Sequence, residues 1–414
     1  MLRILDQAEA APFLNRATHR LDNASEIVKP MVQDVRDRGD VAVREYAEKL
    51  DGFTGESFIV ESCGELDPAL LEAVTIAAKN IRDFAQQQLV KPWQTTTSDG
   101  RTLGQLVRPL DSVGVYVPAG RYPLLSTMLM TVIPAQVAGV HEIVVVCAKP
   151  TPEMLAMAKW LGITSILKLG GAQAIAALAY GTESIGKVQR IVGPGNAYVA
   201  AAKRRVFGKV GIDMIAGPSE ILVIADADNT PDWIALDLLS QAEHDESAQS
   251  ILITDDAEFG EKVMQAVTRQ LETLERRAIA GASWRDFGAV IVVNDMAEAA
   301  ALSNRLAPEH LELCVADPDG LAAQITHAGA IFLGAWTPEA IGDYIGGPNH
   351  VLPTARSARF SSGLSVMDFV KRTTLTNMTP ASLAAIGPAA EVLAISEGLE
   401  AHGLSVRARL DKLN

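Results

Sequence analysis

The sequence is poor in cysteine, in aromatic residues and in positive charge. Its three cysteines, Cys63, Cys147 and Cys314, lie far apart, which excludes a disulfide framework and a zinc site built from cysteine. Lys and Arg number 36 against 50 Asp and Glu, so the formal net charge is −14. Because phosphate-rich partners require clustered positive charge, nucleic acid and membranes are not expected as partners. We expect a protein of the reducing cytoplasm.

Several familiar signals are also missing. No apolar run reaches the roughly 18–20 residues that span a bilayer, because Pro134, Gly139 and Glu142 interrupt the apolar stretch 128–147. No charged-then-apolar leader is predicted at the amino terminus. No Gly-x-Gly-x-x-Gly follows a predicted strand, and the His-Glu-x-x-His pattern of zinc proteases is absent.

The chain of 414 residues is too long for one core, so two or three domains are expected. Short apolar runs alternate with helical patterns, which predicts parallel βαβ units. The predicted strands cover 114–117, 142–147, 165–169, 190–192, 220–224, 251–254, 289–293 and 311–315. The predicted helices cover 125–138, 152–161, 172–180, 197–207, 231–244, 260–277 and 296–306, with more helix in 21–89 and from 380 onward. The sequence therefore predicts two α/β units with helical material at both ends.

Four of the seven histidines lie among other polar residues. His244 follows Gln241 by three residues on a helix that Thr230 and Pro231 begin. At that spacing an amide oxygen and an imidazole can face one metal ion. A histidine that interacts with the helix dipole would explain the same position without a metal.

Two other histidines have an acidic neighbour. Glu309 and His310 lie where a helix ends and a strand begins. Such a pair is suited to general acid–base catalysis. Alternatively, the two residues are solvated side chains of a surface turn. His350 and Asp343 share a loop, residues 342–354, that mixes glycine and proline with apolar anchors. That composition is typical of an ordered site loop.

The fourth histidine, His402, lies with Glu397 near the carboxyl terminus, on a segment that a solvated helix face would also explain. A glutamine, an aspartate and two histidines would together suit zinc better than magnesium, because imidazole is present.

Two glycine-rich turns, 169–173 and 192–198, connect a predicted strand to a helix. Free backbone N–H groups at such a helix start can hold a phosphate, although these turns occur in any α/β fold. A third turn, 217–220, carries the hydroxyl of Ser219.

Taken together, the segments resemble the histidinol dehydrogenase family over nearly the whole chain. The resemblance is carried by residues 113–118, 170–173, 193–196, 217–220, 240–244, 307–310, 342–354 and 397–402. It implies an enzyme with one zinc per subunit that uses NAD to oxidise L-histidinol through L-histidinal to L-histidine, the last step of histidine biosynthesis. It also implies a homodimer with swapped terminal segments, in which each subunit has two incomplete Rossmann-like parallel-sheet units.

The resemblance assigns roles to single residues. The implied metal ligands are Gln241, His244, Asp343 and His402 of the partner subunit. The implied substrate contacts are these four with Ser219, Glu309, His310, His350 and Glu397. The implied cofactor contacts are Tyr116, Gln173 and Asn196. His310 would remove the hydroxyl proton in the first oxidation, and Glu309 would activate water for the second.

We expect an amino-terminal helical segment in residues 1–20 and a helical tail in 356–414 that reaches the partner subunit. Residues 21–114 plus 219–355 would form a first α/β domain with the metal and catalytic residues. Residues 115–218 would form a second, on the cofactor side. In one departure from many family members, the segment Ala119–Met130 follows Pro118 where they have a Gly-Gly pair and small residues.

Three other functions remain open from the residues. A paralogue with the same scaffold, zinc and NAD could oxidise another polar alcohol such as a sulfonated diol, but His350 and Glu397 suit an amino- and imidazole-bearing substrate. A zinc hydrolase would use the same ligand types to activate water. A non-catalytic nucleotide-binding protein is the third alternative.

Overall fold

The computed structural model of the chain describes residues 4–5, 19–118 and 124–413. Most of the expected amino-terminal helical segment therefore lies outside the described residues, as do residues 119–123 of the departing segment 119–130. Residues 4–5 of that segment form a strand, β1 (Ile4–Leu5). The chain divides into two compact units: Met1–Gln88 with Asp111–Phe369, and Leu89–Leu110 with Val370–Asn414.

The first unit contains two six-stranded sheets. The sheet that we call the first has the order β2-β7-β6-β5-β8-β9. Its strands are β2 (Ile59–Glu61), β5 (Ser112–Tyr116), β6 (Glu142–Val146), β7 (Ser165–Leu167), β8 (Arg190–Val192) and β9 (Gly211–Ile212). All neighbours are parallel except β2 and β7. From β5 the chain adds two strands on one side and then two on the other, so the strand order reverses between β5 and β8, as in Rossmann-like folds.

Four helices connect the strands of the first sheet. They are α5 (Leu125–Ala138), α6 (Pro152–Trp160), α7 (Gly171–Tyr180) and α8 (Ala197–Val206). Their positions confirm the predicted βαβ pattern, and α5 and β8 have the predicted bounds.

The second sheet repeats this strand order. Its sequence of strands is β1-β12-β11-β10-β13-β14, all parallel. The strands after β1 are β10 (Glu220–Ala225), β11 (Gln249–Thr254), β12 (Ala289–Val292), β13 (His310–Cys314) and β14 (Ala330–Leu333). The sequence patterns missed β1, β2, β9 and β14, which are two to four residues long.

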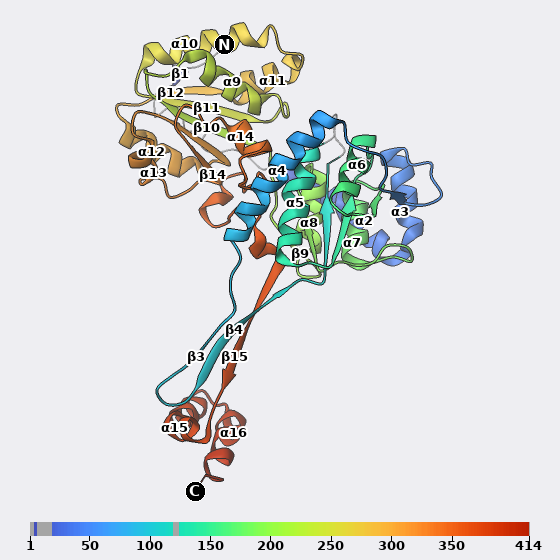
Figure 1. Cartoon of the computed structure of the whole chain (residues 1–414), viewed down its shortest axis with the longest axis vertical. Helices are drawn as coiled ribbons and strands as arrows, with labels where there is room; N and C mark the ends of the chain where they lie inside the picture. Colours follow the sequence, from blue (N-terminus) through green and yellow to red (C-terminus); the bar gives the residue numbers. More distant parts are fainter. Residues whose placement is uncertain (1–3, 6–18, 119–123, 414) are drawn as a thin grey trace. The chain divides into compact units, whose positions relative to one another are not determined.

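Helices cover both faces of the second sheet (Figure 1). Ile221 and Val223 pack with α9 (Pro231–Ala242), α10 (Ala257–Leu271) and α11 (Arg277–Phe287). Leu222 and Ile224 pack on the other face with α12 (Met296–Leu306) and α13 (Pro318–Ala322). Burial on both faces explains why β10 is apolar throughout rather than alternating. A short helix, α14 (Glu339–Tyr344), follows β14.

The helices before the first sheet differ from the expected division. Helices α2 (His19–Arg38) and α3 (Asp40–Tyr46) pack in one core with the first sheet rather than with residues 219–355. Val28 and Val35 lie at helical spacing and contribute to a buried stripe in this core, which also contains residues of α7 and α8. The π-helix η1 (Ala47–Asp51) follows, and α4 (Pro68–Gln87) completes this part of the chain. The chain passes from the first sheet to the second between β9 and β10.

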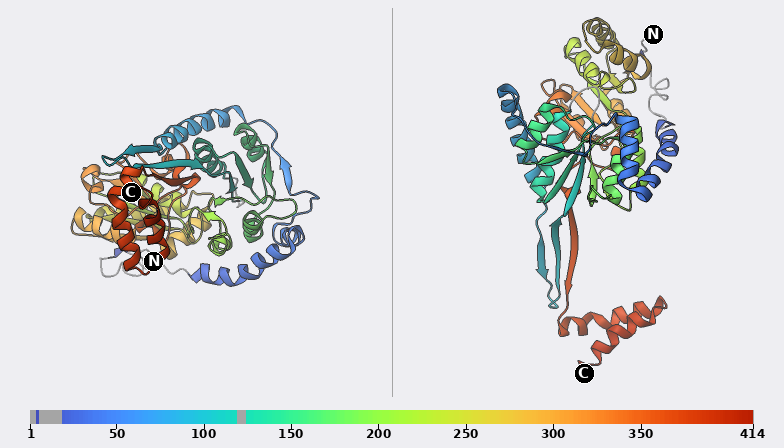
Figure 2. Two further views of the ribbon diagram at one scale, coloured as in Figure 1. Left: turned by 90° about the horizontal axis from the view of Figure 1, so that it is seen from below. Right: turned by 90° about the vertical axis from the view of Figure 1, so that its right-hand side faces the viewer.

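The second unit is a three-stranded antiparallel sheet with two helices. The strand order is β15-β4-β3, with β3 (Trp93–Thr96), β4 (Thr102–Pro109) and β15 (Val370–Asn377). Helices α15 (Pro380–Ser396) and α16 (Glu400–Leu410) follow and pack together, and Figure 2 shows the strands as a narrow ribbon. The expected tail from 356 instead begins with two short 3₁₀ helices, η2 (Ser357–Arg359) and η3 (Val366–Phe369), and the strand β15, and its α-helices begin only at Pro380. Among the described residues no helix is long and apolar enough to cross a membrane.

Candidate functional site

The centre of the candidate site is His310, the first residue of β13. Glu339 and Asp343 lie four residues apart on α14, so both project from one face of that helix. Nδ1 of His310 is 3.0 Å from Oε1 of Glu339, and Nε2 is 3.6 Å from Oδ1 of Asp343. His310 and Glu339 are buried, and Asp343 is mostly so.

The neighbours of His310 define which ring nitrogen carries hydrogen. Nδ1 lies 3.1 Å from the backbone oxygen of Glu220 and 3.0 Å from the Glu339 carboxylate. Both neighbours are acceptors, so Nδ1 must be the donor. Nε2 is buried and has no hydrogen-bond partner in the structure. The geometry therefore leaves Nε2 as the nitrogen that can accept a proton from a ligand.

The charges around His310 favour its protonated form. Burial alone would lower the pKa of His310, but the carboxylates of Glu339 and Glu309, with Asp343, together raise it well above its usual value. Burial would likewise raise the pKa of Asp343, but its interaction with His310 and the charges of His350 and His244 lower it below its usual value. The centre is thus a compact arrangement of one base and several buried acids.

Glu309 lies beside this centre. Its Oε2 accepts a hydrogen bond of 2.9 Å from the backbone nitrogen of Glu220, and Nδ1 of His310 is 3.9 Å away. Burial is the main cause that raises the pKa of Glu309 to about 8. A carboxyl with that pKa can exchange a proton near neutral pH, which suits a general base.

Gln241 and His244 lie at the carboxyl end of α9. Nε2 of Gln241 lies 3.2 Å from Nδ1 of His244, and Oε1 of Gln241 is buried without a hydrogen-bond partner. The charge of His244 also contributes to the low pKa of Asp343. An unpartnered amide oxygen, an imidazole and a carboxylate are a donor set that fits zinc. These residues could hold the ion that the sequence predicts.

A second group at the same place could also hold a cation. Ligand atoms of His310, Glu339 and Asp343 all lie within 4.8 Å of one another. This group shares Asp343 with the expected ligand set, so the two alternatives compete for one position. Carboxylates and a histidine suit a divalent metal in either arrangement.

His350 connects the two sheets of the first unit. Its Nδ1 lies 2.9 Å from the backbone oxygen of Asp343, and its Nε2 lies 3.4 Å from Oγ1 of Thr127 on α5. Burial is the main cause that lowers the pKa of His350. Ser219, half-buried, directly precedes β10. Glu397 and His402 belong to the second unit, where both side chains are exposed.

The expected cofactor residues gather at the carboxyl ends of the first sheet. The Tyr116 hydroxyl, at the end of β5, accepts a hydrogen bond of 3.1 Å from the backbone of Gly171. Gln173 is fully buried; its Nε2 donates to Asp51 at 2.9 Å, and its Oε1 has no partner. Asn196 caps α8, because its Oδ1 accepts from the backbone nitrogens of Tyr198 and Val199, each at 3.1 Å.

The glycines of these turns lie so close to neighbouring groups of the protein that a side chain would clash. A Cβ at Gly193 would lie 2.2 Å from the backbone oxygen of Tyr116, and the φ of Gly193 is +108°. A Cβ at Gly171 would lie 2.8 Å from Gln173 Oε1. Glycine at these positions lets strand and turn pack closely at the reversal point, and the unpartnered Gln173 oxygen is an acceptor available to a ligand there. This arrangement fits a dinucleotide.

The two groups of residues lie at opposite ends of their strands. Glu309, His310 and Glu220 lie at the amino ends of β13 and β10, whereas Tyr116 and Gly193 lie at the carboxyl ends of β5 and β8. In the second sheet the carboxyl edge is occupied by its own loop, since Asp226 Oδ2 accepts from the backbone of Ala316 at 2.7 Å.

Comparison with known proteins identifies the family. The family model described as histidinol dehydrogenase matches residues 14–410. The histidinol dehydrogenase of Ruegeria pomeroyi is 61% identical over 94% of this chain and 92% of its own length. The protein of the same name from Cereibacter sphaeroides is 59% identical over 99% of this chain and 97% of its own.

The chain belongs to the histidinol dehydrogenase family. A solved structure with that name, from Elizabethkingia anophelis, is 36% identical, covers 99% of this chain and 98% of its own, and superposes with a TM-score of 0.93. The mixed α/β fold with parallel sheets is therefore that of the histidinol dehydrogenase family, and the chain is an oxidoreductase.

The sequence patterns missed several residues of the site. Glu339 was missed although it lies four residues before Asp343, a spacing that places two side chains on one helix face. Asp51 was missed because it is far in sequence from the turn at Gly170, with which it forms a backbone hydrogen bond. Asp51 is the last residue of the π-helix η1. Such π-helical turns are often found near functional sites, but they have no clear sequence signature.

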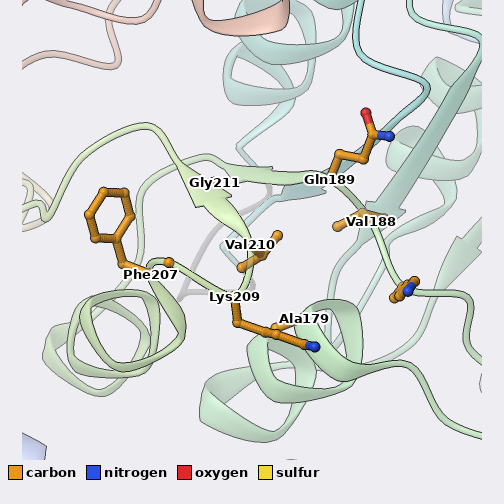
Figure 3. A pocket seen from close by; sticks show the side chains of 9 residues that line it. Ala179, Val188, Gln189, Phe207, Lys209, Val210 and Gly211 are labelled. Atoms are coloured by element: carbon orange, nitrogen blue, oxygen red, sulfur yellow. The ribbon is translucent and has the colours of Figure 1, made fainter. Parts of the chain in front are cut away.

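A hollow of about 450 Å³ lies at the other end of the first sheet (Figure 3). It is lined by residues before β8 and β9, among them Lys187, Gln189, Phe207 and Lys209. None of the expected site residues lines it.

Proposed function

We propose that this member of the histidinol dehydrogenase family oxidises L-histidinol through L-histidinal to L-histidine in the cytoplasm, with NAD as the oxidant of both steps. One observation carries the proposal: the unpartnered Nε2 of His310 lies beside Asp343, with Nδ1 held as a donor. An alcohol must lose its hydroxyl proton as hydride leaves, and this nitrogen is a base beside a possible metal ligand.

The residues divide the two oxidations between them. In the neutral form of the ring, Nε2 of His310 accepts the hydroxyl proton of the alcohol, and the carboxylate of Glu339 stabilises the imidazolium that forms. Glu309 accepts a proton from the water that adds to the aldehyde. NAD, when bound, accepts the hydride of each step. Tyr116, Gln173 and Asn196 would hold it at the carboxyl edge of the first sheet.

Gln241, His244 and Asp343 would hold one zinc ion per subunit, with His402 of the partner subunit as the fourth ligand. Bound zinc supplies a fixed positive charge that orients the amino and imidazole groups of the substrate. Ser219, His350 and the partner's Glu397 would contact the substrate. The unpartnered oxygen of Gln241 supports the place of this residue in the ligand set, because a buried oxygen without a partner is costly unless a ligand binds it.

Exposed apolar surfaces support a homodimer with exchanged terminal segments. Val392, Leu393 and Ile395 of α15 are more than half exposed. In the first unit Trp336 is 85% exposed and meets Trp233 edge to face, with ring centroids 5.1 Å apart. Patches of this kind mark interaction sites. Each would be covered if the second unit of one chain lay against the first unit of another.

The proposal is tested by following NADH formation with L-histidinol, L-histidinal and a panel of polar diols, together with metal analysis. We expect two NADH per histidinol and one zinc per chain. Good turnover of a sulfonated diol without histidinol oxidation would identify a paralogue. Hydrolysis of a substrate without NAD would identify a zinc hydrolase instead.

The shared site has a separate test. His244→Ala and His402→Ala should each be inactive as homodimers but recover part of the activity when mixed and allowed to exchange subunits, because one site of the heterodimer keeps both histidines. No recovery after demonstrated exchange would contradict the shared site.

A further inference from the structure

A buried ion pair lies behind the turn at the reversal point of the first sheet. Lys203 on α8 pairs with Asp213, which follows β9, and their side chains are only 2% and 1% exposed. Neither residue was singled out by sequence patterns. Two fully buried charges are costly to desolvate, and apolar residues of similar size would often be as stable there. The pair therefore needs a reason beyond general stability.

The contacts of the pair converge on Gly193, the residue after β8. Nζ of Lys203 donates to the backbone oxygen of Gly193 at 2.9 Å. Oδ2 of Asp213 accepts from the backbone nitrogen of Gly193 at 2.7 Å. The other Asp213 oxygen accepts from Lys203 and from the backbone of Met214. Both backbone polar groups of Gly193 are thus bound by one ion pair.

Gly193 is a position where the backbone conformation needs such support. Its φ of +108° is available almost only to glycine, and its Cα lies so close to Tyr116 that a Cβ would clash. Glycine is also the residue with the most freedom to move away from this conformation. Hydrogen bonds to both sides of its peptide backbone remove that freedom.

Holding Gly193 also fixes the residues after it. Pro194 and Gly195 lead from Gly193 to Asn196, the cap of α8. Lys203 lies on α8, seven residues after Asn196. Its contact with Gly193 therefore ties the helix to the turn a second time, in addition to the chain connection through Asn196. The position of the Asn196 cap and of the first turn of α8 then depends on the ion pair.

We propose that Lys203 and Asp213 are positioning residues for the dinucleotide, which hold the turn 193–196 and the start of α8 in the conformation that binds its phosphates. This inference rests on the proposed use of NAD. The two residues act through the backbone of Gly193 and do not touch the cofactor. A purely structural pair would instead stabilise the fold without a particular effect on dinucleotide affinity.

The experiment compares Lys203→Met, Asp213→Asn and the double variant Lys203→Met/Asp213→Leu in the zinc-loaded full-length enzyme. Arg190→Met is the matched control, because Arg190 begins the same strand, β8, and its 2.9 Å pair with Asp368 is half-buried at the opposite end. The measurements are the Kd of NADH by fluorescence titration, bound zinc, the thermal midpoint, and amide hydrogen exchange in residues 193–199.

We expect both single variants to weaken NADH binding about tenfold or more and to raise the KM for NAD more than they lower kcat, because small misplacements of binding groups are costly. Exchange in 193–199 should become faster while bound zinc stays the same. Arg190→Met should keep its NADH affinity within about twofold. The double variant should be thermally more stable than either single variant but should bind NADH as weakly as they do. It therefore still tests the inference if the single variants fold poorly.

Recovery of NADH affinity together with stability in the double variant would overturn the inference, as would wild-type affinity in the single variants. Equal weakening of NADH binding by Arg190→Met would overturn it too. If the wild-type enzyme itself binds no NADH, the proposed function fails as well, and that outcome is distinct from the other three.

Discussion

The carboxylate of Glu339 lies 3.0 Å from Nδ1 of His310, and both side chains are buried. Histidine and acid come from different elements, β13 and α14, so the pair depends on how these two elements pack. The same acid is also a candidate ligand in the alternative metal group. Substitution of Glu339 therefore distinguishes a role as the partner of His310 from a role as a metal ligand.

Glu339→Gln should lower kcat for histidinol by about 10- to 100-fold, because the imidazolium of His310 loses a compensating negative charge. KM and bound zinc should change little. Steady-state kinetics and metal analysis on the same preparation measure both. Glu258→Gln, which removes an exposed acid of α10, is the control and should behave as wild type. Loss of zinc in proportion to activity would show that Glu339 is a metal ligand.

Glu309→Gln should impair histidinal oxidation at least about tenfold more than histidinol oxidation, because only the second step needs activated water. Burial raises the pKa of Glu309 to about 8, and the base is the deprotonated form. The rate of the aldehyde step should therefore increase as pH rises toward about 8, and this dependence should disappear in the variant. Separate assays with the alcohol and the aldehyde check the prediction, and equal loss in both would contradict it.

Asp343→Asn should reduce bound zinc and histidinol oxidation together, because the ion loses its only charged ligand in the expected set. Binding of NADH, at the carboxyl edge of the other sheet, should remain within about twofold. Chelation of the wild-type enzyme should have the same pair of effects, and added zinc should reverse them. Glu246→Gln, an exposed neighbour of His244, serves as the control. Loss of NADH affinity along with the metal would show that the two sites are not independent.

The carboxyl of Asp237 on α9 interacts with that of Glu312 on β13, whose pKa burial raises well above its usual value. Burial is the main cause that raises the pKa of Asp237 to about 6. The folded protein thus binds more protons than the unfolded chain between pH about 4 and 6, and stability falls as pH rises through that window. Asp237→Asn should flatten this slope in thermal midpoints recorded across pH. An unchanged slope would contradict the assignment, and Asp83→Asn, at an exposed ion pair, is the control.

Much of the fold could be predicted because its strands are buried on both faces and stand out as apolar runs. Helix α12 and strand β8 were predicted with the bounds that the structure has. The strand β15 was not, because Lys371, Arg372 and Thr373 carry no apolar signal and pair only with residues near 107. Nothing in the local sequence of either strand indicates the other.

The residues of the site likewise fall into those that the sequence predicts and those that it does not. His310 and Glu309 are adjacent, and Gln241 and His244 have helical spacing, so sequence patterns identified both pairs. Lys203 and Asp213 come together only because β8 and β9 are neighbours in the sheet. Such contacts between separate elements have no spacing rule, so they emerge only from the packed structure.

The pairing of β4 with β15 has a consequence for synthesis of the chain. The hairpin of β3 and β4 leaves the ribosome early, but its third strand begins only at residue 370. At ordinary elongation rates the wait is on the order of tens of seconds. During that time β4 has an open hydrogen-bonding edge, where another nascent chain can pair and seed aggregation. Arg108 and the two threonines of β3, Thr95 and Thr96, keep the hairpin polar while it waits.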